Sequence, residues 1–180
     1  MAKLQNRAKQ TRISKSAKGD DLFLRAVQEE EKGNVRLAFR LCLAGAKAGD
    51  LSCQVNVGNL YDDAKGTKRN RVAALYWYKR AYRRGNAAAA SNIGIMWRNE
   101  GKTKRALSWF RKAVRLGDED ANLEIAKYYL NAEFDPARAI PCLEKVQESD
   151  SVCEATAEEA VALLKAAKMK LKKDNKTIKS

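Results

Sequence analysis

Residues 74–94 read ALYWYKRAYRRGNAAAASNIG, and this stretch decides how the rest of the chain is interpreted. Its opening, ALYWYKRA at 74–81, matches ALSWFRKA at 106–113 after a shift of 32 residues. In the other direction a shift of 36 residues places Gly85 on Gly49, with the extra residues in the polar segment DDAKGTKRN. Self-similarity over such a distance is typical of helical repeats, which bury little surface alone and stack to form one core.

Each repeat is predicted to be a pair of helices, so the expected fold class is all-α: a right-handed helical-repeat solenoid of paired antiparallel helices. Glycine at the end of a helix and Asp or Asn just after it are typical of a left-handed C-cap followed by a new N-cap. The expected caps are Gly49 with Asp50, Gly85 with Asn86, and Gly117 with Asp118. The expected first helices are 51–63, 87–99 and 119–131, and the second helices are 35–48, 71–84 and 103–116.

The C-terminal part of the chain predicts a poorer fourth copy and a final helix. Asp135 is the expected cap of the fourth copy, with Pro136 in its first turn. Pro141 then falls inside that helix and should kink or shorten it. The pattern Ser-x-x-Glu from Ser151 predicts a capping box and a helix over residues 152–172.

The repeated motif resembles that of a known family. Ala-x-x-Trp-Tyr-Lys-x-Ala-x-x-x-Gly (74–85) followed by Ala-x-x-Asn-Ile-Gly-x-Met-Trp (89–97) resembles the Sel1-like repeat, a relative of the tetratricopeptide repeat. The resemblance is good over residues 33–130 and weaker over 131–160. It implies an α-solenoid that serves as a protein-interaction scaffold or adaptor, and it names neither a reaction nor a partner.

Composition argues against an enzyme. The 180 residues include no histidine, which removes Ser–His and Cys–His nucleophile pairs and every histidine metal site. There is no Gly-rich phosphate loop and no recognisable pair of inward carboxylates, so we expect no cofactor and no metal. No apolar run reaches membrane-spanning length, and the basic N-terminus has no apolar stretch after it, so the sequence predicts a soluble cytoplasmic protein. The expected organisation is a repeat domain over 20–164 with basic tails at 1–19 and 165–180.

The net charge of +14 is unevenly distributed. Residues 64–115 hold fifteen basic groups and one acidic group, whereas residues 116–164 hold three basic and twelve acidic groups. Projected on a helix, Ala74, Trp77, Tyr78 and Ala81 form a core face, and the cations lie on the other side. We call the predicted row of outward residues in the second and third repeats the basic ridge: Tyr76, Lys79, Arg80, Arg83, Arg84, Arg111, Lys112 and Arg115.

A cationic surface of this kind favours an anionic partner, and the sequence leaves several open. An acidic protein would meet the ridge through Arg–carboxylate bonds, and this is the partner we favour. A nucleic acid would use the same cations for its phosphates, with Tyr76 as the evident aromatic for stacking. An acidic membrane would engage the tails near Met169 and Leu171. A solvated face with no partner, or self-association with the acidic end of a second copy, also fits the charges.

A second candidate surface and the cysteines complete the expectations. In the resembled family the first helices line a groove, which makes candidates of Asn56, Asn59, Asn92, Asn99, Tyr128 and Asn131. Asparagine suits peptide backbone because its amide both donates and accepts. Two cysteine pairs, 42 with 53 and 142 with 153, have the same spacing, and a secreted Sel1-like subgroup carries disulfides at such junctions. We favour buried free thiols, because the spacing differs and the middle repeats lack cysteine.

Overall fold

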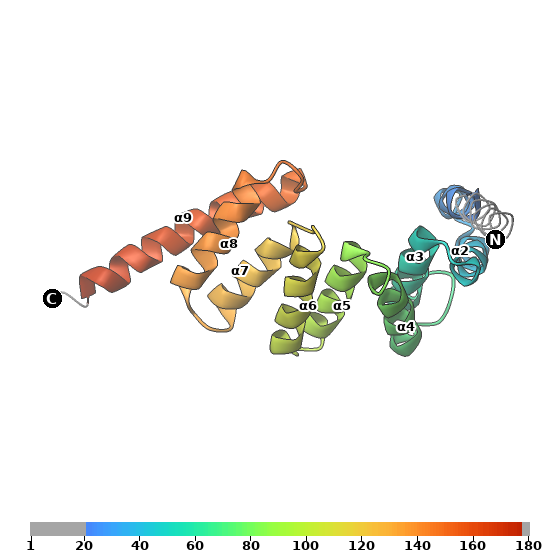
Figure 1. Ribbon diagram of the computed structural model, residues 1–180, viewed down its shortest axis with the longest axis horizontal. Coiled ribbons are helices and arrows are strands. Elements are labelled where there is room, and N and C mark those ends of the chain that lie inside the picture. Colours follow the sequence, from blue (N-terminus) through green and yellow to red (C-terminus); the bar gives the residue numbers. More distant parts are fainter. Residues whose placement is uncertain (1–20, 178–180) are drawn as a thin grey trace, which may run out of the picture. The chain divides into compact units, whose positions relative to one another are not determined.

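A computed structural model describes residues 21–177, and every secondary-structure element among them is a helix. The chain divides into two compact units, Met1–Ala89 and Ala90–Ser180. The border falls inside one helix and inside the segment that the sequence predicts as one domain. A helix over 21–31 is followed by α2 (Val35–Ala48), α3 (Leu51–Asp62), α4 (Arg71–Tyr82), α5 (Ala87–Asn99), α6 (Thr103–Arg115), α7 (Ala121–Asn131), α8 (Pro136–Glu148) and α9 (Glu154–Thr177) (Figure 1).

Successive helices pack side by side within each unit. In the first unit α2 packs on α3 and α3 on α4, and in the second α6 packs on α7, α7 on α8 and α8 on α9 (Figure 1). The predicted helix pairs are therefore confirmed, with boundaries within two residues for the repeats over 35–131. The predicted tail at 1–19 lies outside the described residues, and α9 continues through most of the predicted tail at 165–180.

The predicted left-handed glycines are confirmed at all three junctions, with Gly85 at φ 85° and Gly117 at φ 93°, and the predicted side-chain N-caps at two of them. Gly49 ends α2 at φ 101°, a conformation that a residue with a Cβ adopts only at a cost, and Asp50 Oδ1 accepts from Cys53 N at 2.6 Å. Asn86 likewise accepts from Ala89 N at 2.8 Å. The prediction for Asp118 is wrong: its carboxylate accepts from the Ser91 hydroxyl, and α7 begins three residues later without a side-chain cap.

Two expectations at the C-terminal end concern Pro141 and Ser151. Pro141 does not shorten α8, which continues through it to Glu148. A prolyl nitrogen cannot donate to the preceding turn, so α8 continues without that hydrogen bond. The capping box at Ser151 does not form, since its backbone N–H donates to the Ser149 hydroxyl at 3.3 Å. The final helix instead starts at Glu154, where Cys153 Sγ meets the Thr156 hydroxyl at 2.9 Å.

Two glycines let aromatic rings of the neighbouring helix pack against a helix backbone. A Cβ on Gly58 would lie 2.3 Å from Cε1 of Tyr78, and one on Gly94 would lie 2.6 Å from Cε1 of Phe110. Both rings are almost fully buried. Each of these close approaches lies within a single unit.

The longer loop between α3 and α4 packs onto the beginning of α2. A Cβ on Gly66 would lie 2.1 Å from the carbonyl oxygen of Val35. Lys65 reaches Glu30 at 3.4 Å, so the same loop also contacts the helix over 21–31. At its end, Asn70 caps α4 by accepting from Ala73 N at 3.0 Å. The inserted residues are thus an ordered part of the first unit.

Candidate interaction surfaces

The helix α4 carries the first-unit part of the predicted basic ridge. Its inward face is confirmed, with Trp77 and Tyr78 buried beside two alanines, and Tyr76 opposite is 55% exposed. Arg80 Nη1 donates to the Tyr76 hydroxyl at 3.3 Å, and its guanidinium lies 5.5 Å from the Trp77 ring centroid. Lys79 is half-buried and Arg83 is exposed.

Arg84, also predicted in the ridge, is engaged within the first unit. Its Nη1 donates to the carbonyl oxygen of Gly49 at 2.5 Å. This bond satisfies a carbonyl at the end of α2, where a cation is also favoured by the helix dipole. Arg84 therefore connects the end of α4 to the junction between α2 and α3, and it has fewer N–H donors left for a binding partner.

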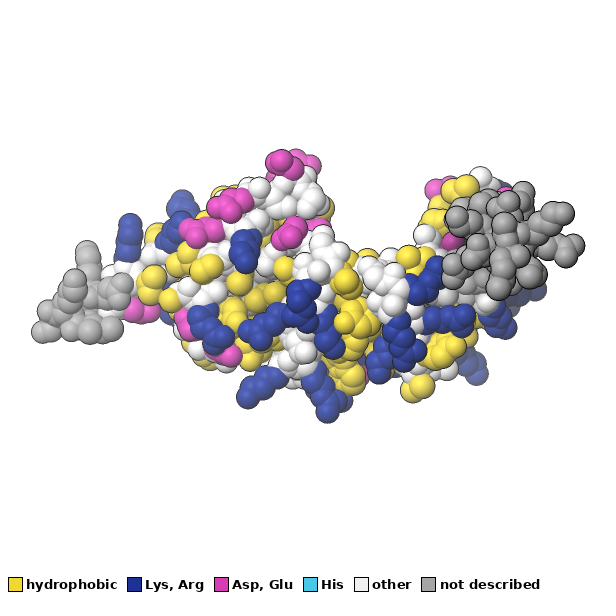
Figure 2. Space-filling view, in the orientation of Figure 1, with side chains coloured by type: hydrophobic (Ala, Val, Ile, Leu, Met, Phe, Trp, Pro, Cys, Tyr) yellow, Lys and Arg dark blue, Asp and Glu magenta, His cyan; other side chains and the backbone are white. Residues whose placement is uncertain are grey.

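The helix α6 carries the second-unit part. Its apolar side, with Leu107 and Phe110, is buried, and the segment from Gly101 to Gly117 contains six cations and no acidic residue. Lys112 Nζ lies 3.8 Å from the ring centroid of Trp109, which is half-buried rather than a core residue. Arg115 is exposed. Figure 2 shows Lys and Arg side chains gathered over the α4 and α6 regions, and Asp and Glu over the turn between α8 and α9.

The groove candidates are divided between two cavities, one in each unit. In the first unit Asn56 and Asn59 line a cavity of about 450 Å³ with Phe23, Val27 and Val55. Their amides already have partners, since Asn56 Nδ2 donates to Cys42 Sγ at 3.3 Å and Asn59 Oδ1 accepts from the Tyr78 hydroxyl at 2.7 Å. Structural bonds thus use part of the hydrogen-bonding capacity that the sequence assigned to ligand recognition.

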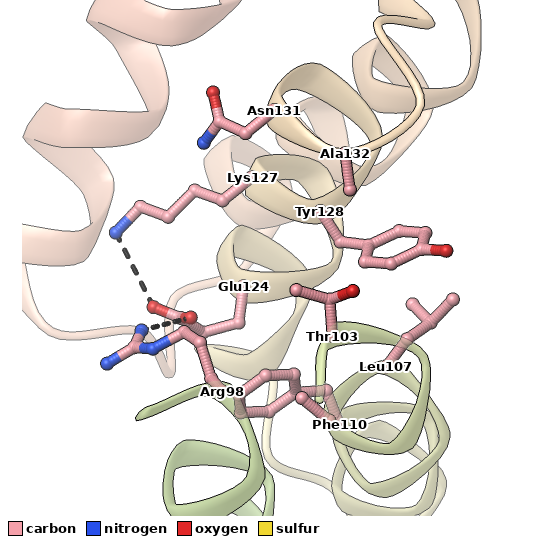
Figure 3. Close-up of a pocket in the computed structure, with 10 residues that line it drawn as sticks. Arg98, Thr103, Leu107, Phe110, Glu124, Lys127, Tyr128, Asn131 and Ala132 are labelled. Carbon is pink, nitrogen blue, oxygen red and sulfur yellow. Dashed lines mark hydrogen bonds and ion pairs between the residues drawn. The ribbon is translucent and has the colours of Figure 1, made fainter. Parts of the chain in front are cut away.

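In the second unit a pocket of about 240 Å³ lies between α6 and α7. Figure 3 shows the rings of Phe110 and Tyr128 and the side chain of Leu107 around it, with Asn131 at one end. Burial and a hydrogen bond to Glu133 raise the pKa of the Tyr128 phenol. Of the remaining candidates, Asn92 is half-buried and Asn99 is exposed, and neither lines either cavity.

Charged residues that the sequence analysis did not single out line one side of this pocket. The Glu124 carboxylate accepts from both Arg98 and Lys127, the latter at 3.5 Å (Figure 3). Lys127 also reaches Glu159 at 2.8 Å, which links α7 to α9. Arg98 and Glu124 are 26 positions apart in the sequence, and Lys127 and Glu159 are 32 apart. The packing of the helices brings these charged residues together.

A second group that the sequence analysis missed surrounds Tyr129 of α7. The phenol oxygen accepts from Arg111 Nη2 at 2.6 Å and from Arg138 Nη2 at 3.0 Å. The Arg138 guanidinium also lies 4.2 Å from the Tyr129 ring centroid, and its Nη1 pairs with Glu133 at 2.6 Å. One ridge residue, Arg111, is thereby held against α7 instead of pointing freely outward.

The four cysteines are free thiols in different surroundings. Cys42 and Cys53 are buried on the neighbouring helices α2 and α3. Their contact with each other is the largest cause of a lowered pKa at Cys42 and a raised pKa at Cys53. Cys142 is half-buried, and burial raises its pKa, whereas Cys153 is exposed.

Within residues 21–177, no helix is both long and apolar enough to cross a lipid bilayer. We call the predicted ridge residues of the first unit, on α4 and the turn after it, the α4 patch, and those of the second unit, on α6, the α6 patch. Four of the groove candidates line cavities, two in each unit.

Comparisons with known proteins agree with the repeat pattern. No protein-family model matches the chain. Over 85 residues it is 29% identical to a sel1-like repeat-containing protein of Acanthamoeba polyphaga mimivirus, in an alignment that covers 47% of this chain and 16% of the relative.

Two solved structures are similar in fold. The Sel1 repeat protein from Oxalobacter formigenes matches with a TM-score of 0.60 at 27% identity, covering 72% of this chain and 56% of that one. A protective antigen of uropathogenic Escherichia coli that displays an SLR fold matches with a TM-score of 0.59 at 18% identity, covering 91% and 47%, and shows likeness of fold alone. The chain thus spans about half the length of these structures. With the repeated motif and the stacked helix pairs, these likenesses support a Sel1-like repeat family for the chain, whose fold is an all-helical solenoid.

Proposed function

We propose that the chain is a non-enzymatic protein-interaction module, an adaptor, complex subunit or target-neutralising binder. It engages a partner with an acidic surface through the α4 and α6 patches. The cavities that contain Asn56, Asn59, Tyr128 and Asn131 add apolar and amide contacts. The support from relatives is the repeat class itself, because helical repeats of this kind present extended surfaces to other proteins.

The observation that carries the proposal is the recurrence of the same cations in two repeats. Lys79, Arg80 and Arg83 stand where the next repeat has Arg111, Lys112 and Arg115. No acidic residue occurs between Ala64 and Asn99 or between Gly101 and Gly117, so carboxylates of the same helices do not offset these charges. Such surfaces raise association rates with acidic partners and disfavour basic ones.

The test is capture of partners from native lysate by the wild-type chain and by a charge-reversal variant, with and without nuclease. The variant carries Arg80→Glu, Arg83→Glu and Arg115→Glu. A matched control carries Arg36→Glu, Arg40→Glu and Lys47→Glu on α2, which are exposed as Arg83 and Arg115 are and change the net charge by the same amount. We expect one protein to be retained after nuclease by the wild type and the control, and lost by the ridge variant. Retention by both variants would remove the patches from the proposal.

Nucleic acid is the alternative partner that this experiment separates. The cations of α4 and α6 fit phosphates as well as carboxylates, and the exposed Tyr76 offers a ring for stacking. If everything captured disappears with nuclease, and if affinity for single-stranded RNA falls steeply as salt rises, the module binds nucleic acid instead.

A further inference from the structure

Two arginines from different helices converge on one neutral oxygen in the second unit. Arg111 of α6 and Arg138 of α8 both donate to the phenol of Tyr129, at 2.6 and 3.0 Å. Tyr129 belongs to α7, which packs against both helices and buries the side chain to 6% exposure. The two guanidinium groups are therefore held at neighbouring positions by a residue that cannot itself move far.

The positive charge at this place is only partly offset. Glu133 pairs with Nη1 of Arg138, and no carboxylate among residues 21–177 pairs with Arg111. Burial raises the pKa of the Cys142 thiol, and the positive charges of Lys145, Arg111 and Arg138 all lower it. Lys145 is therefore a third cation close to the two arginines. A guanidinium has five N–H donors in a planar fork, so each arginine keeps donors that the phenol does not use.

The preceding repeat contains a related arrangement that lacks this convergence. There the Arg105 guanidinium lies 5.1 Å from the ring centroid of Trp97, which occupies the position of Tyr129 one repeat earlier. Indole has no oxygen that could accept from a second arginine, and the residue equivalent to Arg111 is Lys79. Packing an arginine on the aromatic ring is thus shared by the two repeats, whereas the second guanidinium depends on the tyrosine hydroxyl.

We propose that Arg111 and Arg138, held together on Tyr129, form a binding site for a phosphate group. A phosphate dianion offers several oxygens to two guanidinium forks at once and supplies the negative charge that the cluster lacks. A single carboxylate has half that charge and two oxygens. The group can arrive as inorganic phosphate or on a phosphorylated side chain of a partner. The site goes beyond the proposed function, because inorganic phosphate alone should occupy it.

The first experiment is a titration of the full chain with inorganic phosphate at constant ionic strength, followed by NMR of the arginine Nε–H groups. Saturable shifts are expected at two arginine signals, and equal concentrations of chloride should not produce them. Arg111→Gln and Arg138→Gln should each weaken phosphate binding about tenfold or more, because each removes a charge-assisted donor pair. A phosphoserine peptide compared with inorganic phosphate shows which source is preferred.

Three variants separate a built site from a general positive field. Arg111→Lys keeps the charge and removes the fork, and it should weaken binding nearly as much as Arg111→Gln. Glu133→Gln removes the competing carboxylate of Arg138 and should tighten binding several-fold. Lys104→Gln removes an exposed charge from the same helix and should change binding by less than about twofold, since long-range surface charges are screened.

The outcomes are distinct from those of partner capture. Absence of saturation in the wild type, or equal losses in Lys104→Gln and Arg111→Gln, would overturn the phosphate site. Circular dichroism spectra establish that the arginine variants remain helical, and the expected gain in Glu133→Gln cannot arise from misfolding. If Arg111→Gln loses phosphate binding but still captures the partner protein, the proposed interaction function stands independently of the phosphate site. If the wild type binds phosphate but captures no partner protein, the phosphate site stands without the proposed function.

Discussion

Replacing Gly58 by alanine tests how closely α3 and α4 approach. The new Cβ would lie 2.3, 2.5 and 2.9 Å from three atoms of the Tyr78 ring, whereas ordinary contacts are about 3.5–4 Å. The ring is buried and rigid, so either it or α4 must shift. Overpacking of this kind costs about 1–3 kcal/mol.

Two further contributions set the expected net effect. Alanine favours a helix over glycine by about 1 kcal/mol, which opposes the clash. Displacement of the ring also pulls the Tyr78 hydroxyl from Asn59, a 2.7 Å bond whose loss costs about 1 kcal/mol. We therefore expect Gly58→Ala to lower the free energy of unfolding by about 1–3 kcal/mol, as a net loss after the helix-propensity gain.

The assay is urea unfolding followed by circular dichroism, with two companion variants. The double variant Gly58→Ala/Tyr78→Leu should be less destabilised than the sum of its single variants, because a smaller side chain relieves the clash. The chain supports this pairing, since Ala126 and Leu143 stand at the equivalent positions one repeat later than Gly94 and Phe110. Ala88→Gly, at an exposed helical site, reports the propensity effect alone. A Gly58→Ala protein as stable as the wild type, or additive losses in the double variant, would refute this reasoning.

Three other measurements follow from the first unit and the cysteines. Burial is the largest cause of a raised pKa at Tyr78, whose ordinary value is 10.0, and Asp62 and Asp63 add to it. Folding therefore favours the neutral phenol, so stability should be intact below pH 10 and fall above it by up to about 1.4 kcal/mol per pH unit. Urea midpoints measured across pH should show a smaller fall in Tyr78→Phe. Asp50→Ala removes the cap on Cys53 N and should cost about 1 kcal/mol in thermal or urea unfolding, whereas Asp50→Asn should retain most of it. A thiol reagent should label Cys153 first, Cys142 more slowly, and Cys42 and Cys53 only as the chain unfolds; early labelling of Cys42 would contradict its burial, and mass spectrometry of digests gives the order.

Features that depend on local pattern were predictable from the sequence. The αL position of Gly49 and the cap at Asp50 follow from residue types at adjacent positions, and the burial of Trp77 and Tyr78 follows from helical spacing. Each of these inferences needs at most one helix and its junction.

Features that depend on the rotation of one helix against another were not predictable. The bonds from Arg111 and Arg138 to Tyr129 join residues 18 and 9 positions apart on three helices, and nothing in the spacing indicates that both arginines reach the same oxygen. Asp118 illustrates the opposite error. It stands where a cap is expected, but the segment GDED offers several acidic residues, and its carboxylate is taken by Ser91 of a different helix.

The loop that packs on the first turn of α2 affects how such a chain can change in evolution. Repeat arrays lengthen by duplication of whole units, and a duplicated unit must fit on either side of its neighbours. In this chain Gly66 fits against the Val35 carbonyl so closely that there is no room for a Cβ. A duplicated copy of the unit would bring the same loop against the start of a different helix. A duplicated unit would therefore keep this loop in place only where the preceding helix start offers the same fit to a glycine.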